Sequence, residues 1–311
     1  MSSAREFCDE IVRTLSAAPD IDRIVAGCIV RFSTNGKRGD DSGWCKLFED
    51  GRAGVFGNWR TGEQHTWHAS DREYTDARDR QRDREVVAAA QEARAVEEAQ
   101  RHARAAEAAR RIWTNAQPCV AHGYLDRKGV GADHIRVQFA HAAECRRQFF
   151  SDRGPMRGLL LLVPVRDMEW RLWSLQAIDS EGNKSFLRAG RTRGMFHVVG
   201  GEKLRRANED FTGPIAVAEG YATAWSIAHE LDQWPTFVAF SAENLVPVAN
   251  AVRRRFPRAR ITICGDNDES GRGQQAAESA AAEIGGLVAI PASPGDWNDV
   301  ARRRARSGEP A

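Results

Sequence analysis

The sequence predicts an α/β protein: a C-terminal parallel sheet with flanking helices, preceded by a mixed α+β basic subdomain, a long connector helix and a small β-rich N-terminal domain. Three observations predict this order. After Pro214, short apolar strands alternate with amphipathic helices, the pattern of βαβ units in a parallel sheet. Residues 71–117 contain neither glycine nor proline and are rich in alanine, arginine and glutamate, which favours a helix. Before residue 70, short apolar runs between glycines indicate antiparallel strands.

The composition fits a globular chain of two or three domains. Of 311 residues, 42% are hydrophobic and 28% are charged. No apolar run reaches the ~18–20 residues of a membrane-spanning helix, and the N-terminus has no apolar core of a secretion signal. We therefore expect a cytoplasmic protein with no membrane partner. The six cysteines form no CxxC pair, so no zinc site is expected, and the absence of a P-loop argues against a Walker-type NTPase.

Positive charge is concentrated in the middle of the chain. The net charge is only +2, from 45 basic and 43 acidic residues, and just five of the basic residues are lysines. Residues 124–206 carry 16 basic and 9 acidic side chains, a local excess of +7. The arginine bias has two explanations that stay open: a GC-rich genome, or recognition of phosphate, for which the guanidinium fork is well suited.

The N-terminal domain, residues 1–70, is expected to open with a helix over Ala4–Ala17 and to continue as a small sheet. Its aromatic residues alternate with cations, a pattern that can bind a DNA template by base stacking and phosphate contact. The candidates for DNA binding are Trp44, Trp59, Arg60, Lys37 and Arg38. The alternative is that the aromatic residues form the core of the sheet.

The helix over residues 71–117 has mostly alanine at its apolar positions, so its burying face is thin. It is interpreted as a solvated connector, with a weak coiled coil as the alternative. Residues 118–210 are expected to form the basic subdomain, with strands at Gly158–Pro164, Arg171–Ile178 and Met195–Val199. Residues 211–311 are expected to form the last domain.

Four apolar runs are the expected strands of that domain: Ile215–Gly220, Thr236–Ser241, Arg260–Asp266 and Leu287–Pro291. Helices are expected to begin near Ala222, Asn244 and Gly271. Because ligands bind beyond the carboxyl ends of parallel strands, residues at those ends are the candidates for function.

Acidic residues occur at three of these strand ends. Glu219 ends the first strand, Asp266 and Asp268 end the third, and Asp296 and Asp299 follow the fourth. Converging carboxylates repel each other unless a hard divalent cation such as Mg²⁺ neutralises them. Glu219, on a separate strand, could transfer a proton. The alternative for each aspartate is a helix cap or a solvated turn.

The segment Ile215–Val300 resembles the Toprim domain of primases, topoisomerases and some nucleases. The matching residues are Glu219-Gly220 and Gly265-Asp266-Asn267-Asp268, followed by Gly271. The resemblance implies that Glu219 is a general acid/base, and that Asp266 and Asp268 hold Mg²⁺, with Mn²⁺ as a substitute. Asp296 resembles a further acidic position of the metal site.

Motifs before this segment resemble those of bacterial, phage and plasmid primases. They are Leu161–Asp167 (LLVPVRD), Lys184–Leu187 (KSFL) and His122–Val130 (HGYLDRKGV). The resemblance implies that Arg166, Lys184, Arg127 and Lys128 bind nucleoside triphosphate or primer. Unlike the replicative primases of this family, the sequence has no ligand set for a zinc ribbon.

The expected function is a DNA primase that makes short primers on single-stranded DNA from NTPs by Mg²⁺-dependent nucleotidyl transfer. A replicative helicase acting in trans is a hypothesis for a partner. The alternatives are a Toprim nuclease and a non-catalytic DNA-binding accessory protein of replication. A topoisomerase is disfavoured, because Tyr221 is better explained by packing beside Glu219 than by transesterification.

Overall fold

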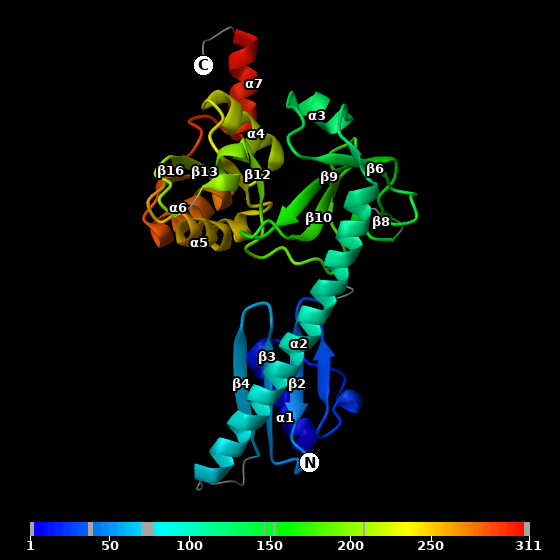
Figure 1. Cartoon of the computed structure of the whole chain (residues 1–311). Coiled ribbons are helices and arrows are strands. Elements are labelled where there is room, and N and C mark those ends of the chain that lie inside the picture. The colour runs from blue at the N-terminus through cyan, green and yellow to red at the C-terminus, as the bar shows by residue number, and fades with distance from the viewer. Residues whose placement is uncertain are drawn as a thin grey trace. The chain divides into compact units, whose positions relative to one another are not determined.

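The computed structural model describes residues 3–36, 40–69, 77–145, 147–151, 154–207 and 209–307 (Figure 1). It divides into two compact units, residues 1–95 and 96–311, with the boundary inside one long helix, α2 (Ala77–Asn115). Within the described residues, no helix combines the length and the apolar character needed to cross a membrane.

The first unit contains a helix packed on a four-stranded antiparallel sheet whose strands follow chain order. Its elements are α1 (Ser3–Leu15), the 3₁₀ helix η1 (Ile21–Arg23), β1 (Ile29–Phe32), β2 (Gly43–Leu47), β3 (Ala53–Asn58) and β4 (Glu63–His68). Phe7 of α1 is fully buried, and its ring centroid lies 5.3 Å from that of Trp67. Gly54 permits this approach, because a Cβ there would lie 2.7 Å from the Phe7 ring. The predicted β-rich N-terminal domain is confirmed.

The C-terminal part of α2 belongs to the core of the second unit. Ala105, Ala109 and Ile112 are buried there in a cluster that includes Leu160 and Leu162. The predicted long helix is confirmed, but the prediction that it is solvated is wrong for these turns. Alanine side chains are small enough to let a helix pack closely against a sheet, so a thin apolar face still buries well.

An antiparallel five-stranded sheet forms the basic subdomain, in the order β11-β10-β9-β6-β5. Its strands are β5 (Gln117–Pro118), β6 (Arg136–Phe139), β9 (Leu159–Arg166), β10 (Leu172–Ile178) and β11 (Lys184–Phe186). Beside it lie α3 (Gly123–Lys128) and a hairpin of β7 (Phe150–Ser151) and β8 (Gly154–Pro155). The predicted α+β character of this region is confirmed.

The C-terminal sheet has the order β12-β14-β13-β15-β16. Its strands are β12 (His197–Val199), β13 (Pro214–Ala218), β14 (Thr236–Val238), β15 (Arg260–Cys264) and β16 (Leu287–Ala289). The four strands after residue 213 are parallel, as predicted. The run Met195–Val199 was expected in the basic subdomain, but β12 instead pairs antiparallel with β14. A short apolar run indicates a strand without indicating its partner.

Helices cover both faces of this sheet (Figure 1). They are α4 (Tyr221–Glu230), α5 (Leu245–Arg255), α6 (Arg272–Ile284) and α7 (Trp297–Ser307), with 3₁₀ helices η2 (Gly201–Arg206) and η3 (Ala242–Asn244). Residues of α5 and α6 share one hydrophobic cluster, and α4 shares another with α3 and β9. The second cluster is common to both sheets of the unit.

Tyr221, at the start of α4, joins the two subdomains. Its side chain is 1% exposed. Its hydroxyl donates to the carbonyl of Gly131 (3.0 Å) and accepts from the backbone N–H of Asp133 (2.8 Å). The interpretation of Tyr221 as a packing residue is confirmed. The contact fixes the loop after α3 against the residues that follow Glu219.

Candidate active site

The carboxyl ends of β13 and β15 bring two predicted acids to one edge of the sheet. These strands are neighbours, and their last paired residues are Ala218 and Cys264. Glu219 directly follows Ala218, and Asp266 lies two residues beyond Cys264. β14 lies on one side of β13 and β15 lies on the other, so the direction of the chain connections reverses at β13. Ligands of open α/β sheets bind at such a switch point, beyond the carboxyl ends of the strands.

Asp266 is the most perturbed acid of this edge. Its Oδ1 is buried and has no hydrogen-bond partner among the described residues. Its pKa is raised to about 7, first by burial and then by the charges of Glu219, Asp296 and Asp268, while Lys184 lowers it. The pKa of Asp266 therefore responds to carboxylates from the ends of two other strands.

Asp268 is oriented by the start of α6. Its carboxylate accepts hydrogen bonds from the Ser270 hydroxyl (2.5 Å) and from the backbone N–H of Gly273 (2.8 Å), and these lower its pKa. A Cβ on Gly273 would lie 2.6 Å from the carbonyl oxygen of Asp266 and 2.9 Å from Asp268 Oδ2, so glycine lets the helix meet this loop. The helix-cap alternative therefore describes Asp268, and not Asp266.

Asp296 and Asp299 cap α7 reciprocally. The backbone N–H of Asp299 donates to Asp296 Oδ1 (2.9 Å), and that of Asp296 donates to Asp299 Oδ2 (3.3 Å). The other oxygen of Asp296, Oδ2, lies 3.8 Å from the Nζ of Lys128. Asp296 thus links the start of a helix to a cation of the basic subdomain.

Lys184 reaches the acidic edge from the other sheet. Its Nζ would lie 4.0 Å from a Cβ placed on Gly220, the residue after Glu219. Burial lowers the pKa of Lys184, whereas the nearby charge of Glu219 raises it. For Glu219, burial raises the pKa, and Lys184 opposes this. The two groups therefore face each other at the boundary of the subdomains.

A cavity of about 500 Å³ lies beside these groups. Its lining residues are Tyr124, Arg127, Lys128, Glu181, Gly182, Lys184 and Arg302. Three of the four predicted nucleotide-binding residues therefore share one cavity. Tyr124 and Arg302 were not predicted. Tyr124 lies inside the HGYLDRKGV motif, but for Arg302 the sequence carried no signal.

Arg166 is not brought to this cavity. Lys184 pairs with Ile178, which pairs with Leu161 near the start of β9, whereas Arg166 ends that strand. Five strand residues separate the two positions, about 16 Å. The Arg166 guanidinium instead donates to the carbonyl of Trp170 (3.2 Å). The structure therefore does not place Arg166 beside Lys184, and nucleotide or primer binding by Arg166 stays a prediction.

The faces of Trp44 and Trp59, the two aromatic candidates for base stacking, are covered by other groups of the first unit. Trp44 is 2% exposed, and its ring stacks on Trp59 with centroids 4.5 Å apart. The guanidinium of Arg94 lies over the Trp59 ring, 3.2 Å from the centroid. The prediction that Trp44 and Trp59 stack on DNA bases is corrected, because protein groups already occupy these rings.

Of the three predicted cations of the first unit, the structure describes only Arg60. Arg60 donates to Asp40 Oδ1 at 2.6 Å. Lys37 and Arg38 lie outside the described residues. DNA binding by these three residues stays a prediction.

The acids at the sheet edge provide an oxygen ligand suited to a magnesium ion. The buried, unpartnered Oδ1 of Asp266 is a hard oxygen donor beside further carboxylates. In the part of the chain that the structure describes, no three His, Cys, Asp or Glu side chains form a ready metal site. Mg²⁺ needs only one or two carboxylates when waters and substrate phosphates complete its shell, so the donor set fits.

The raised pKa of Asp266 predicts a pH-dependent stability. Its pKa is about 7 in the folded chain against 3.8 when unperturbed, so the folded state binds this proton more tightly. Below about pH 4 Asp266 is protonated in both states and does not destabilise the folded chain. Above about pH 7 it is ionised in both states, and the folded chain carries the full cost of the buried charge. With a chelator present, Asp266→Asn should therefore stabilise the protein at pH 8 by about 1–2 kcal/mol, a few degrees of Tm, and not at pH 4. Thermal melts at both pH values measure this, and a lower Tm at pH 8 would contradict it.

Comparison with known sequences supports the site. A family model of the Toprim domain matches residues 214–307. The chain is 31% identical over 274 residues to a DNA primase TraC of Escherichia coli, covering 84% of this chain and 24% of that protein. A second Escherichia coli TraC is 28% identical over 268 residues, covering 82% and 17%. The chain thus spans a quarter or less of the length of these relatives.

Solved primase structures are only loosely similar. The zinc-binding and RNA polymerase domains of the Aquifex aeolicus primase are 15% identical, with 99% of this chain and 84% of that chain covered and a TM-score of 0.45. The primase fragment of the bacteriophage T7 primase-helicase protein is 18% identical, with 63% and 77% covered and a TM-score of 0.42.

Proposed function

Because residues 214–307 are a Toprim domain and most of the chain is similar to DNA primases, we propose that this protein is a primase that joins nucleotides on a single-stranded DNA template. The observation that carries the proposal is the meeting of Glu219 and Asp266 at the switch point of the sheet, opposite Lys184. Carboxylates beside a cation-lined cavity suit a reaction on a triphosphate.

In the proposed reaction, the 3′-hydroxyl of one nucleotide attacks the α-phosphate of the next. A new P–O bond forms, the bond to the β-phosphate breaks, and pyrophosphate leaves. Mg²⁺, when bound, would screen the triphosphate charge and stabilise the leaving group. We assign its binding to Asp266 first, with Asp268 and Asp296 as the neighbouring carboxylates.

Glu219 is the proposed acceptor of the hydroxyl proton. Burial raises its pKa above the usual glutamate value, which improves its basicity toward a proton lost in the transition state. Lys184 and Lys128 would neutralise phosphate oxygens from the opposite wall, and Arg127 would add a bidentate contact. All three cations line the cavity of about 500 Å³.

A primer-synthesis assay tests the proposed function. The chain is mixed with an unlabelled single-stranded DNA template, labelled NTPs or dNTPs in parallel, and Mg²⁺ or Mn²⁺. New short labelled oligonucleotides are the expected result, and they also report which nucleotides are used. In a parallel incubation with an end-labelled template and unlabelled nucleotides, shortening of the template without synthesis would instead identify a nuclease, which could use the same acids.

A replicative helicase remains a proposed partner in trans. Co-purification with helicases of the host replicon tests it, and failure with every candidate would refute it.

A further inference from the structure

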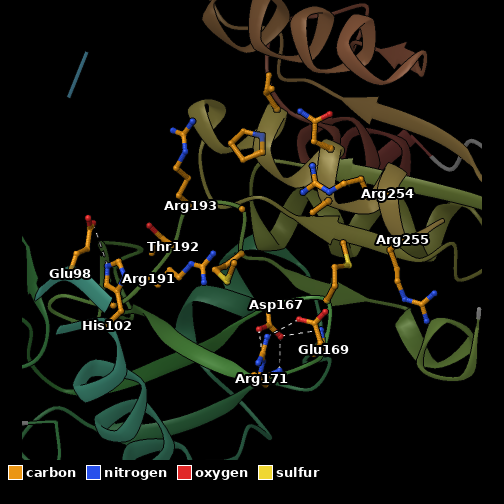
Figure 2. Close-up of a pocket in the computed structure, with 18 residues that line it drawn as sticks. Glu98, His102, Asp167, Glu169, Arg171, Arg191, Thr192, Arg193, Arg254 and Arg255 are labelled. Carbon is orange, nitrogen blue, oxygen red and sulfur yellow. Dashed lines mark hydrogen bonds and ion pairs between the residues drawn. The ribbon is translucent and has the colours of Figure 1, made fainter. Parts of the chain in front are cut away.

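A second cavity, an open cleft of about 950 Å³, lies at the Arg166 end of β9, away from Lys184 (Figure 2). Its walls come from the turn after β9, the segment between β11 and β12, and α5, with two residues from α2. Five arginines line it: Arg171, Arg191, Arg193, Arg254 and Arg255. None of the acids of the candidate active site belongs to this cleft, which we call the arginine cleft.

The acidic residues of the arginine cleft are already paired. Arg171 binds Asp167 (2.8 Å) and Glu169 (3.0 Å), as the dashed lines in Figure 2 show. Glu98 lies 3.9 Å from the ring of His102 and also faces Arg101. Against these three carboxylates the cleft carries five arginines, so the net charge of its lining is +2.

Three of the arginines outside these pairs are the candidates for binding a ligand. Arg191, Arg193 and Arg254 are exposed, and the described residues provide no carboxylate within ion-pair distance of them. They come from two segments about 60 residues apart in sequence, and Figure 2 shows them around the same cleft. The guanidinium of Arg191 lies 5.1 Å from the Trp173 ring centroid, which restricts its orientation. Their convergence in one cleft, without partners, indicates an anionic ligand.

The cleft favours a polymer of phosphates over a small anion. A small ligand is usually enclosed over most of its surface, whereas these arginines are all open to solvent. Burial lowers the pKa of His102, which disfavours its charged form, and the cations among the described residues of the cleft are arginines, whose fork matches phosphate oxygens. Thr192 and Asn250 add neutral hydrogen-bonding groups, and Met168 and Val246 add apolar surface. Among the described residues that line the cleft there is no Phe, Trp or Tyr, so contact would follow the backbone and not the base sequence.

We propose that the arginine cleft binds the phosphate backbone of single-stranded DNA, at a site separate from the catalytic acids. The choice of DNA over another polyanion rests on the proposed function. The position of the site rests on the cleft alone. Such a site would hold the strand at a distance from the reacting nucleotides and raise the time that the enzyme stays on its template.

The test compares two triple variants of the full chain. The first is Arg191→Ala/Arg193→Ala/Arg254→Ala. The control is Arg104→Ala/Arg110→Ala/Arg111→Ala, which removes three exposed arginines of α2 that line none of the described cavities. Binding of a fluorescent oligo(dT) is measured by anisotropy between 50 and 200 mM NaCl, without divalent ions or nucleotides. Each lost phosphate contact lowers the slope of log K against log salt by about 0.7.

The cleft variant should bind about tenfold more weakly at low salt, with a slope smaller by about 2, while the control keeps the wild-type slope. Equal losses in both variants, or none in the cleft variant, would overturn the proposal. So would unchanged DNA binding together with lost binding of polyglutamate, which would indicate an acidic protein partner. If the triple variant does not fold, Arg193→Ala alone should lower the slope by about 0.7. Because no nucleotide is present, a chain that fails in primer synthesis still tests the cleft.

Discussion

Replacing Asp266 with asparagine is expected to lower primer synthesis by about 10²–10³-fold without loss of the fold. The amide keeps the size of the side chain but removes the negative charge at the buried, unpartnered Oδ1. The neighbouring carboxylates cannot replace it, since Asp268 and Asp296 already cap helices. Labelled product formed per minute at saturating NTP and Mg²⁺ measures the loss.

Glu269→Gln is the matched control, because it removes a carboxylate from the same loop at an exposed position. Its activity should stay within about twofold of wild type. The stability gain of Asp266→Asn at pH 8 shows independently that the variant is folded. If Asp266→Asn supports replication as well as wild type, the chain is an accessory protein and the catalytic proposal fails.

Lys184→Met is expected to lower synthesis by about 10²-fold, with most of the loss in kcat. The methionine keeps the length and the apolar stem but removes the ammonium that faces Glu219 and lies in the field of Asp266 and Asp296. Without that charge, the pKa of Glu219 should rise further, because Lys184 lowers it in the wild type. The acidic limb of the pH–rate profile should therefore move to higher pH.

Lys46→Met, in β2 of the first unit, is the control and should leave both the rate and the profile unchanged. A lower rate with an unmoved acidic limb would show that Lys184 does not act on Glu219. An unchanged rate would remove Lys184 from the proposed nucleotide site altogether.

The sequence was most informative where local pattern and function coincide. The positions of Glu219 and Asp266 followed from the ends of apolar strands, because parallel strands must end at a common edge. Lys184 could be connected with that edge only through its resemblance to primases. Its strand belongs to a different sheet, and no spacing in the sequence relates the two sheets.

Other features depend on contacts that a linear pattern does not encode. The separation of Arg166 from Lys184 follows from the pairing register of β9, β10 and β11. The burial of Trp44 follows from the way β2 faces Trp59. The arginine cleft joins segments that are far apart in the chain. The sequence alone therefore could not distinguish its arginines from the many others.

The phenol of Tyr221 has a mechanical consequence. It follows Gly220 directly and hydrogen-bonds to Gly131 and Asp133, so the start of α4, which follows the proposed base, is held against the basic subdomain that carries Lys184. A hinge motion that separates the basic subdomain from the C-terminal sheet would have to break both of these buried hydrogen bonds. We therefore expect that nucleotides enter and pyrophosphate leaves through an opening of the proposed active site that is present throughout the catalytic cycle, with no hinge motion between the subdomains.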